Sequence, residues 1–252
     1  MKVELRLETV TPLFLGGAEQ QPELRPASLR GALRYWFRAM LGGVIGDDDD
    51  ALKELRRREA EVFGETERGS GVVVRLRGML REMASFDLDR DQQGRQTPSG
   101  HNYLYYSTRL GQNRRVPFGA NQSNVVLTLT ARSGVGNAQG ALQKAAAAAW
   151  LLTHLGGIGM RSRRCGGSVQ VVEGSFRDLP EFVVSGQSPQ DLQQHLQTGL
   201  NWPKFQRFWR YRQGISHKTG GEILLITRCL RIGRRKAAPR LEKGWGEMDS
   251  ET

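Results

Sequence analysis

A predicted helix over residues 28–41 constrains the fold more than any other stretch. Pro26 cannot sit in a helix interior and Ser28 is a favourable N-cap, so we expect the helix to begin there and to end before Gly42 and Gly43. At about 100° per residue, one arc of this helix is apolar and is the face that we expect to be buried. That arc holds Leu29, Leu33, Trp36, Phe37, Met40 and Leu41.

Three arginines form a row beside the apolar arc. Arg30, Arg34 and Arg38 lie four residues apart, and such like charges repel by roughly 0.2–0.5 kcal/mol per pair in an isolated helix. Glu23 is the acidic residue within reach upstream, so the sequence predicts little internal neutralisation and favours a phosphate backbone as the partner. Alternatively, the arginine stems cover the edge of the core and keep their charged heads in water.

The remaining patterns predict a βαββαβ order. Strands are expected over 3–7, 71–77, 124–131 and 169–172, and helices over 28–41, 51–64 and 139–155. This order is that of an α+β, ferredoxin-like (RRM-like) core. Asp47–Asp50 precede the helix at 51–64 and lack the spaced ligands of a calcium loop, so we interpret them as a helix start or a solvated loop.

The outward positions of the predicted sheet carry no aromatic residue. They are Glu4, Arg6, Glu8, Arg75, Arg77, Thr128 and Thr130. RNA-recognition modules of this fold stack bases on sheet aromatics. We therefore expect any nucleic-acid contact to come from loops and helix edges.

Two glycine-rich segments are candidates for such contact. Gly16 and Gly17 follow an apolar run, and residues 156–168, GGIGMRSRRCGGS, precede the last strand. Glycine lets the backbone approach a ligand, and arginine forks bind phosphates. The second segment lacks the pattern of a nucleotide-binding P-loop. Its arginines are Arg161, Arg163 and Arg164. The alternative is a flexible connector with solvated arginines.

An insertion at about 79–122 mixes aromatic and basic residues. They are Tyr103, Tyr105, Tyr106, Arg109, Arg114 and Arg115. This mixture suits base stacking with phosphate contacts. The equally favoured alternative is a surface hairpin whose tyrosines pack on the protein itself or on a neighbouring subunit.

The formal net charge of +11 favours a polyanionic partner. No apolar run is long enough to span a bilayer, so we expect a cytoplasmic protein without a membrane partner. Cys165 and Cys229 without a CxxC pattern argue against a disulfide framework or a zinc site. We predict no cofactor and no metal.

Three motifs together resemble the RAMP superfamily, and within it the Cmr (type III-B CRISPR) effector complex. They are TPLFLGGAEQ, ELRPASLRGALRYWFRAMLGG and GGIGMRSRRCGGSVQVV, and the resemblance covers about residues 1–175. It implies a ferredoxin-like domain over 1–175 with a thumb-like insertion. Residues 176–252 would then be a basic C-terminal region, a smaller and reduced second ferredoxin-like or α/β unit with a loose tail.

The resemblance also implies a function. We expect a non-catalytic RNA-binding subunit that contacts guide RNA, target RNA or both and assembles with other Cmr subunits in antiviral defence. The predicted RNA-binding residues are Gly16, Gly17, Arg25, Arg30, Arg34, Arg38, Arg161, Arg163 and Arg164.

Two alternatives stay open. Some RAMP relatives cleave RNA, and His101, Asp87 or Asp89 are the residues to consider for an endoribonuclease. The other alternative is an assembly module whose basic faces meet acidic protein subunits instead of RNA.

Overall fold

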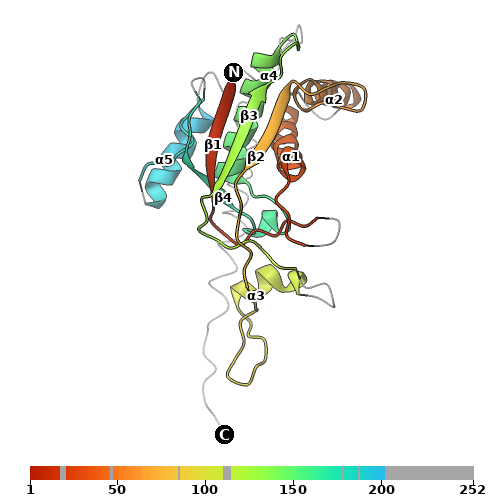
Figure 1. The fold of residues 1–252 in the computed structure, drawn as a ribbon. Coiled ribbons are helices and arrows are strands. Elements are labelled where there is room, and N and C mark those ends of the chain that lie inside the picture. Colours follow the sequence, from red (N-terminus) through yellow and green to blue (C-terminus); the bar gives the residue numbers. More distant parts are fainter. Residues whose placement is uncertain are drawn as a thin grey trace. The chain divides into compact units, whose positions relative to one another are not determined.

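The computed structural model describes residues 1–17, 21–45, 48–84, 86–109, 115–176, 179–186 and 188–201. Along this part of the chain the main elements are β1 (Lys2–Thr9), α1 (Pro26–Ile45), α2 (Asp49–Phe63), β2 (Val72–Arg77), β3 (Val125–Ala131), α4 (Ala138–Leu155), β4 (Val169–Glu173) and α5 (Pro189–Leu200). Between β2 and β3 lie α3 (Gly100–Tyr105) and the 3-10 turn η1 (Tyr106–Thr108), and the turn η2 (Ser162–Arg164) precedes β4. The predicted α+β succession of strands and helices is confirmed (Figure 1).

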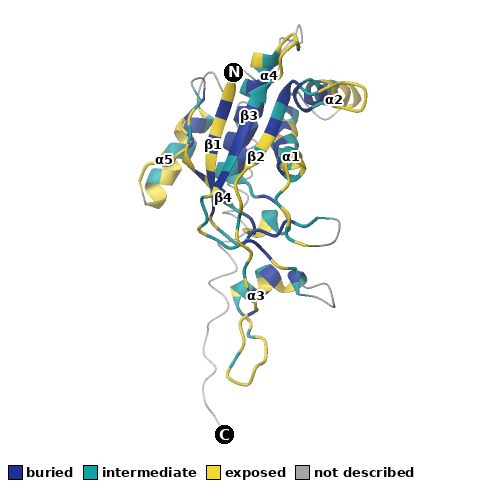
Figure 2. Ribbon diagram, in the orientation of Figure 1, coloured by how far each residue is buried: buried dark blue, intermediate teal, exposed yellow. Residues whose placement is uncertain are grey.

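The four strands form one antiparallel sheet in the order β2-β3-β1-β4. Along β1, Val3, Leu5 and Leu7 are buried while the residues between them are more accessible, as the two-residue period predicts. Figure 2 shows this alternation along the strands. On the described strands the accessible face carries polar residues and a few valines but no aromatic side chain, so a base-stacking platform is absent from it.

Helix α1 is longer than predicted at both ends. It begins at Pro26, because proline in the first helical turn lacks only an amide that has no intrahelical partner there. It continues through Gly42, where a Cβ would have open space, to Ile45. The prediction that Ser28 is the N-cap and that Gly42 and Gly43 end the helix is therefore wrong. Its apolar arc is buried as predicted except at Trp36, which is partly buried; Leu33 and Phe37 are completely enclosed.

Helices α1 and α4 lie on one face of the sheet, and α2 packs against both. The alanine run at 145–149 in α4 is fully buried, which brings the helix backbone close to its neighbours. Asp48 caps α2 by accepting a hydrogen bond at 2.8 Å from the amide of Ala51. The interpretation of the aspartate run as a helix start is thus confirmed at its described residues.

Helix α5 packs against the core beyond the predicted boundary at residue 175. A Cβ on Gly199 would collide with the Trp150 ring of α4, and the Trp150 indole donates to the carbonyl of Glu181 at 2.9 Å. The described residues from Met1 to Asn201 belong to one compact unit. The predicted basic C-terminal region with its reduced second domain is residues 176–252; of these, 202–252 lie outside the described residues, and the second domain stays a prediction.

Candidate nucleic-acid interface

The glycine-rich segment at 156–168 lies against the loop that follows β1. The amide of Met160 donates to the carbonyl of Phe14 at 2.9 Å, and the amide of Gly167 donates to the carbonyl of Pro12 at 2.9 Å. The two segments come together because β1 and β4 are neighbours in the sheet, so the loop leaving one strand meets the loop entering the other.

Two glycines of this segment are required by its own packing. Gly159 has φ +82° and Gly167 has φ +66°, and an added Cβ would collide with the carbonyl oxygens of Phe14 and Ile158 respectively. Arg161 and Cys165 also adopt left-handed backbone conformations, with φ of 66° and 61°. The tight turn at 161–165 thus lies between close backbone contacts, and it does not have the geometry of an open connector.

The insertion lies beside the same segment through α3 and η1. Arg161 Nε donates to the carbonyl of Leu104 at 2.5 Å and its Nη2 donates to the carbonyl of Tyr103 at 3.0 Å. The Arg161 guanidinium also lies 5.4 Å from the centre of the Tyr106 ring. Arg161 therefore joins the glycine-rich segment to the insertion, a connection that no sequence pattern indicates.

A mixed surface of arginine and tyrosine results. The Arg164 guanidinium lies 5.5 Å from the centre of the Tyr103 ring, and Arg163 is exposed beside it. Tyr103 is 64% exposed and Tyr106 is 46% exposed. We call Tyr103, Tyr106, Arg161, Arg163 and Arg164 the loop surface. Guanidinium groups over exposed aromatic rings form a surface that suits both bases and phosphates.

The other predicted residues of the insertion have structural roles or lie outside the described residues. Tyr105 is 5% exposed and packs with Phe14 and Phe86, and this burial raises the pKa of its hydroxyl. Arg109 forms an ion pair with Asp87 at 2.9 Å. Arg114 falls outside the described part of the chain.

Gly16 borders a hollow of about 340 Å³ next to the loop surface. Ser28 from the first turn of α1, Arg115 and Met160 also line it. Gly17 faces the Glu23 side chain, which fills the space that a Cβ would need. Arg25 lies 3.6 Å from the Glu23 carboxylate and donates to the carbonyl of Gly16 at 3.4 Å, so it supports the glycine turn.

The arginine row of α1 has an internal acidic partner, so the prediction of little internal neutralisation is wrong. Glu59 of α2 is 9% exposed and lies 3.4 Å from Arg34 and 3.3 Å from Arg38. Arg34 also donates to the carbonyls of Phe63 and Gly64 at the end of α2. Glu59 follows in a separate helix, and the packing of α1 on α2 brings it to the row.

Arg30 differs from the other two, because no ion pair engages its side chain within the described part of the protein. Its Nε atom is enclosed without a hydrogen-bond partner there, as is the Nε atom of Arg34. It lines a second and larger hollow together with Arg34 and with arginines that the sequence did not single out.

Two findings concern other site classes. Across the described ranges no three His, Cys, Asp or Glu side chains are arranged to hold a metal ion. No helix in these ranges is long and apolar enough to cross a membrane.

The comparisons with known proteins agree on one family. The RAMP superfamily model matches residues 6–170. Two CRISPR system Cmr subunits of Pyrococcus furiosus are each 30% identical to this chain: Cmr1-2 over 66% of this chain and 92% of its own length, and Cmr1-1 over 72% and 51%. The chain thus spans nearly all of one relative and about half of the other.

Solved structures share the fold. The apo crystal structure of Pyrococcus furiosus Cmr1 matches with a TM-score of 0.62 and 21% identity, covering 100% of this chain and 79% of that chain. A chain in the cryo-EM structure of the Type III-B Cmr-beta complex bound to cognate target RNA matches with a TM-score of 0.54 and 14% identity, covering 82% and 62%.

Proposed function

This chain belongs to the RAMP superfamily, and we propose that it is a non-catalytic RNA-binding subunit of a type III-B CRISPR (Cmr) effector complex. In this proposal it contacts guide RNA, target RNA or both, and assembles with other Cmr subunits. The relatives named as Cmr subunits support the assembly, and a related fold occurs in a complex bound to target RNA.

The observation that carries the proposal is the pairing of Arg164 with Tyr103 and of Arg161 with Tyr106. The rings are exposed, so a base has access to an aromatic face while the arginines meet the flanking phosphates. Arg161 already donates two hydrogen bonds to the backbone of the insertion, so its role is mainly to position the tyrosines. Arg163 and Arg164 supply the free charge.

The remaining predicted residues extend this surface. Gly16 lines the adjoining hollow, and Gly17 and Arg25 hold the turn that forms its edge. In the helix row, Arg30 has no ion-pair partner among the described residues, whereas Arg34 and Arg38 share Glu59. We therefore assign Arg34 and Arg38 mainly to joining α1 to α2 and retain Arg30 as an RNA contact.

Photo-crosslinking tests the location. The purified full chain is irradiated with single-stranded RNA that carries 4-thiouridine, and the crosslinked peptides are identified by mass spectrometry. Crosslinks are expected in the peptides that contain Tyr103 and Tyr106. Crosslinks restricted to the exposed sheet face around Arg75 would place the RNA elsewhere and contradict the proposal.

The endoribonuclease alternative has one supporting observation. His101 Nδ1 lies 3.3 Å from Asp89 Oδ1, and the His101 ring packs against Phe86 and Tyr105. Acid–base cleavage requires a second positioned group at the reacting phosphate, and Asp87 is engaged by Arg109. Cleavage of labelled RNA by the wild type that is lost in His101→Ala would support the nuclease; intact RNA in both would contradict it.

A further inference from the structure

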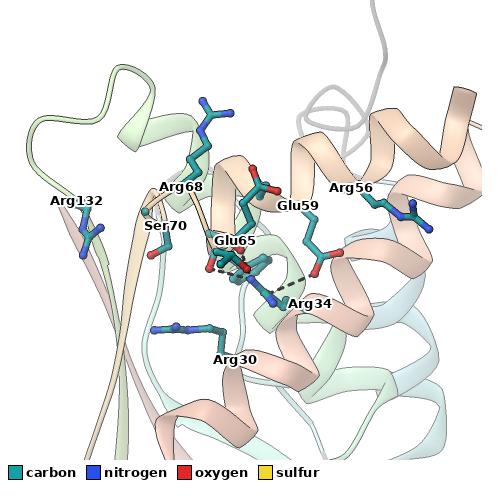
Figure 3. A pocket seen from close by; sticks show the side chains of 13 residues that line it. Arg30, Arg34, Arg56, Glu59, Glu65, Arg68, Ser70 and Arg132 are labelled. Atoms are coloured by element: carbon teal, nitrogen blue, oxygen red, sulfur yellow. Dashed lines mark hydrogen bonds and ion pairs between the residues drawn. The ribbon is translucent and has the colours of Figure 1, made fainter.

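A hollow of about 660 Å³ lies between α1, the end of α2, the turn that leads into β2 and the end of β3 (Figure 3). Its charged lining consists of five arginines and two glutamates: Arg30, Arg34, Arg56, Arg68, Arg132, Glu59 and Glu65. We call it the arginine hollow. The residues of the loop surface do not line it, so it is a separate feature of the molecule.

Among the described residues, most arginines of the arginine hollow have no ion-pair partner. Glu59 is already shared by Arg34 and Arg38, as Figure 3 shows for Arg34. Within the part of the chain that the structure describes, no ion pair engages the side chain of Arg30, Arg68 or Arg132. A cluster of guanidinium groups with this excess favours an anionic ligand.

The shape and chemistry of the lining favour phosphate. Guanidinium forks match phosphate oxygens in pairs, and the volume exceeds that of one phosphate group. The apolar lining residues Ala60 and Phe63 are only 4% and 2% exposed. An acidic protein partner would be expected to place aromatic or aliphatic anchors at the centre of its interface, and no exposed apolar side chain of this lining receives them.

We propose that the arginine hollow binds the phosphates of an RNA backbone, without reading bases, as a second contact for the strand held at the loop surface. No exposed aromatic ring lines the hollow, so bases have nothing to stack on there. Helix α1 connects the two regions, because Ser28 lines the small hollow and Arg30 lines the large one. This inference rests on the proposed function, because that function identifies RNA as the source of the phosphate.

The test compares the full chain with the double variant Arg68→Ala, Arg132→Ala. Both arginines are exposed and make no side-chain ion pair with any residue that the structure describes, so their removal spares the contacts of α1 with α2. The matched control is Arg75→Ala, Arg77→Ala, which removes the same charge from the exposed sheet face. Binding to fluorescent single-stranded RNA is measured across a salt series, and melting temperature is measured with pyrophosphate at constant ionic strength.

The expected result is a roughly tenfold loss of RNA affinity at about 0.15 M salt, with a salt slope shallower by about one unit, in the hollow variant but not in the control. An unchanged slope while the wild type binds RNA would overturn this inference alone; no RNA binding by the wild type would overturn the proposed function.

Pyrophosphate that raises only the wild-type melting temperature, with an unchanged RNA slope, would assign a small phosphate ligand instead. Poly-glutamate binding that only the hollow variant loses would identify a carboxylate partner and overturn the phosphate assignment.

Discussion

Arg164 and Tyr103 are far apart in the sequence and meet with the guanidinium 5.5 Å from the centre of the tyrosine ring. Their pairing joins a loop next to the sheet to a helix inside the insertion. Tyr103 and Arg164 are both exposed, so their contact lies at the protein surface and not in the core. The loop surface is therefore placed to meet a ligand.

Tyr103→Leu is expected to lower the affinity for single-stranded RNA by roughly five- to tenfold, because base stacking on an aromatic ring contributes about 1–3 kcal/mol. The salt slope should stay unchanged, since no charge is removed. Fluorescence anisotropy measures both quantities. Tyr35→Leu is the matched control, because Tyr35 is 54% exposed on α1. Equal effects of the two substitutions would contradict a specific role for Tyr103.

Glu59→Gln is expected to lower the free energy of unfolding by about 1–2 kcal/mol. The substitution leaves Arg34 and Arg38 without their carboxylate, and their partial exposure keeps the cost below that of a fully buried pair. Denaturant unfolding followed by circular dichroism measures the change. Glu65→Gln, in an exposed turn, should leave stability nearly unchanged. A stability of Glu59→Gln equal to that of the wild type would show that the α1–α2 junction does not depend on this carboxylate.

Gly159→Ala is expected to destabilise the protein by about 2–3 kcal/mol, because a Cβ collides with the Phe14 carbonyl and the backbone has positive φ. Gly94→Ala separates these causes, since Gly94 has φ +78° and open space around its Cβ position. Gly94→Ala should cost about 1 kcal/mol. If both variants lose the same stability in chemical unfolding, the close approach of the two loops contributes nothing.

Stability is expected to fall as the pH drops from about 6.5 to about 4. Burial lowers the pKa of His154 to about 4, and His154 Nε2 lies 3.0 Å from His195 Nε2. In this pH range His154 is protonated in the unfolded chain but remains neutral in the folded protein. Protonation therefore favours unfolding. The contribution is at most about 3 kcal/mol. Unfolding measured at pH 7 and pH 4.5 should show a smaller difference in His154→Leu than in the wild type; an identical difference would contradict this assignment.

The strands and the two long helices were predictable from local patterns. Val3, Leu5 and Leu7 alternate with polar residues, and the apolar arc of α1 repeats at the helical period, so each element indicates its own buried face. The ends of α1 were not predictable in this way. Gly42 meets no obstacle in the folded protein, and packing of the helix outweighs the weak preference of glycine to end it.

The candidate site was predictable only as a set of residue types. Arg164 and Tyr103 each lie in a segment whose composition indicates nucleic-acid contact, but their contact depends on how the insertion folds back on the glycine-rich segment. No sequence pattern indicated Glu59 as the partner of the arginine row, because a glutamate on an amphipathic helix is usually solvated. Arg68 and Arg132 lie in turns that look unremarkable in sequence, and only the tertiary fold brings them to one hollow with Arg30.

The salt dependence of RNA binding by wild type and by Arg163→Ala, Arg164→Ala tests the central claim most directly. The full chain is titrated into fluorescent single-stranded RNA across a salt series, and RNA integrity is checked in the same samples. We predict intact RNA, a steep linear decrease of log affinity with log salt for the wild type, and a slope shallower by about one unit in the variant. Equal slopes for the two proteins, or no binding by the wild type, would contradict the assignment of the loop surface as the RNA contact.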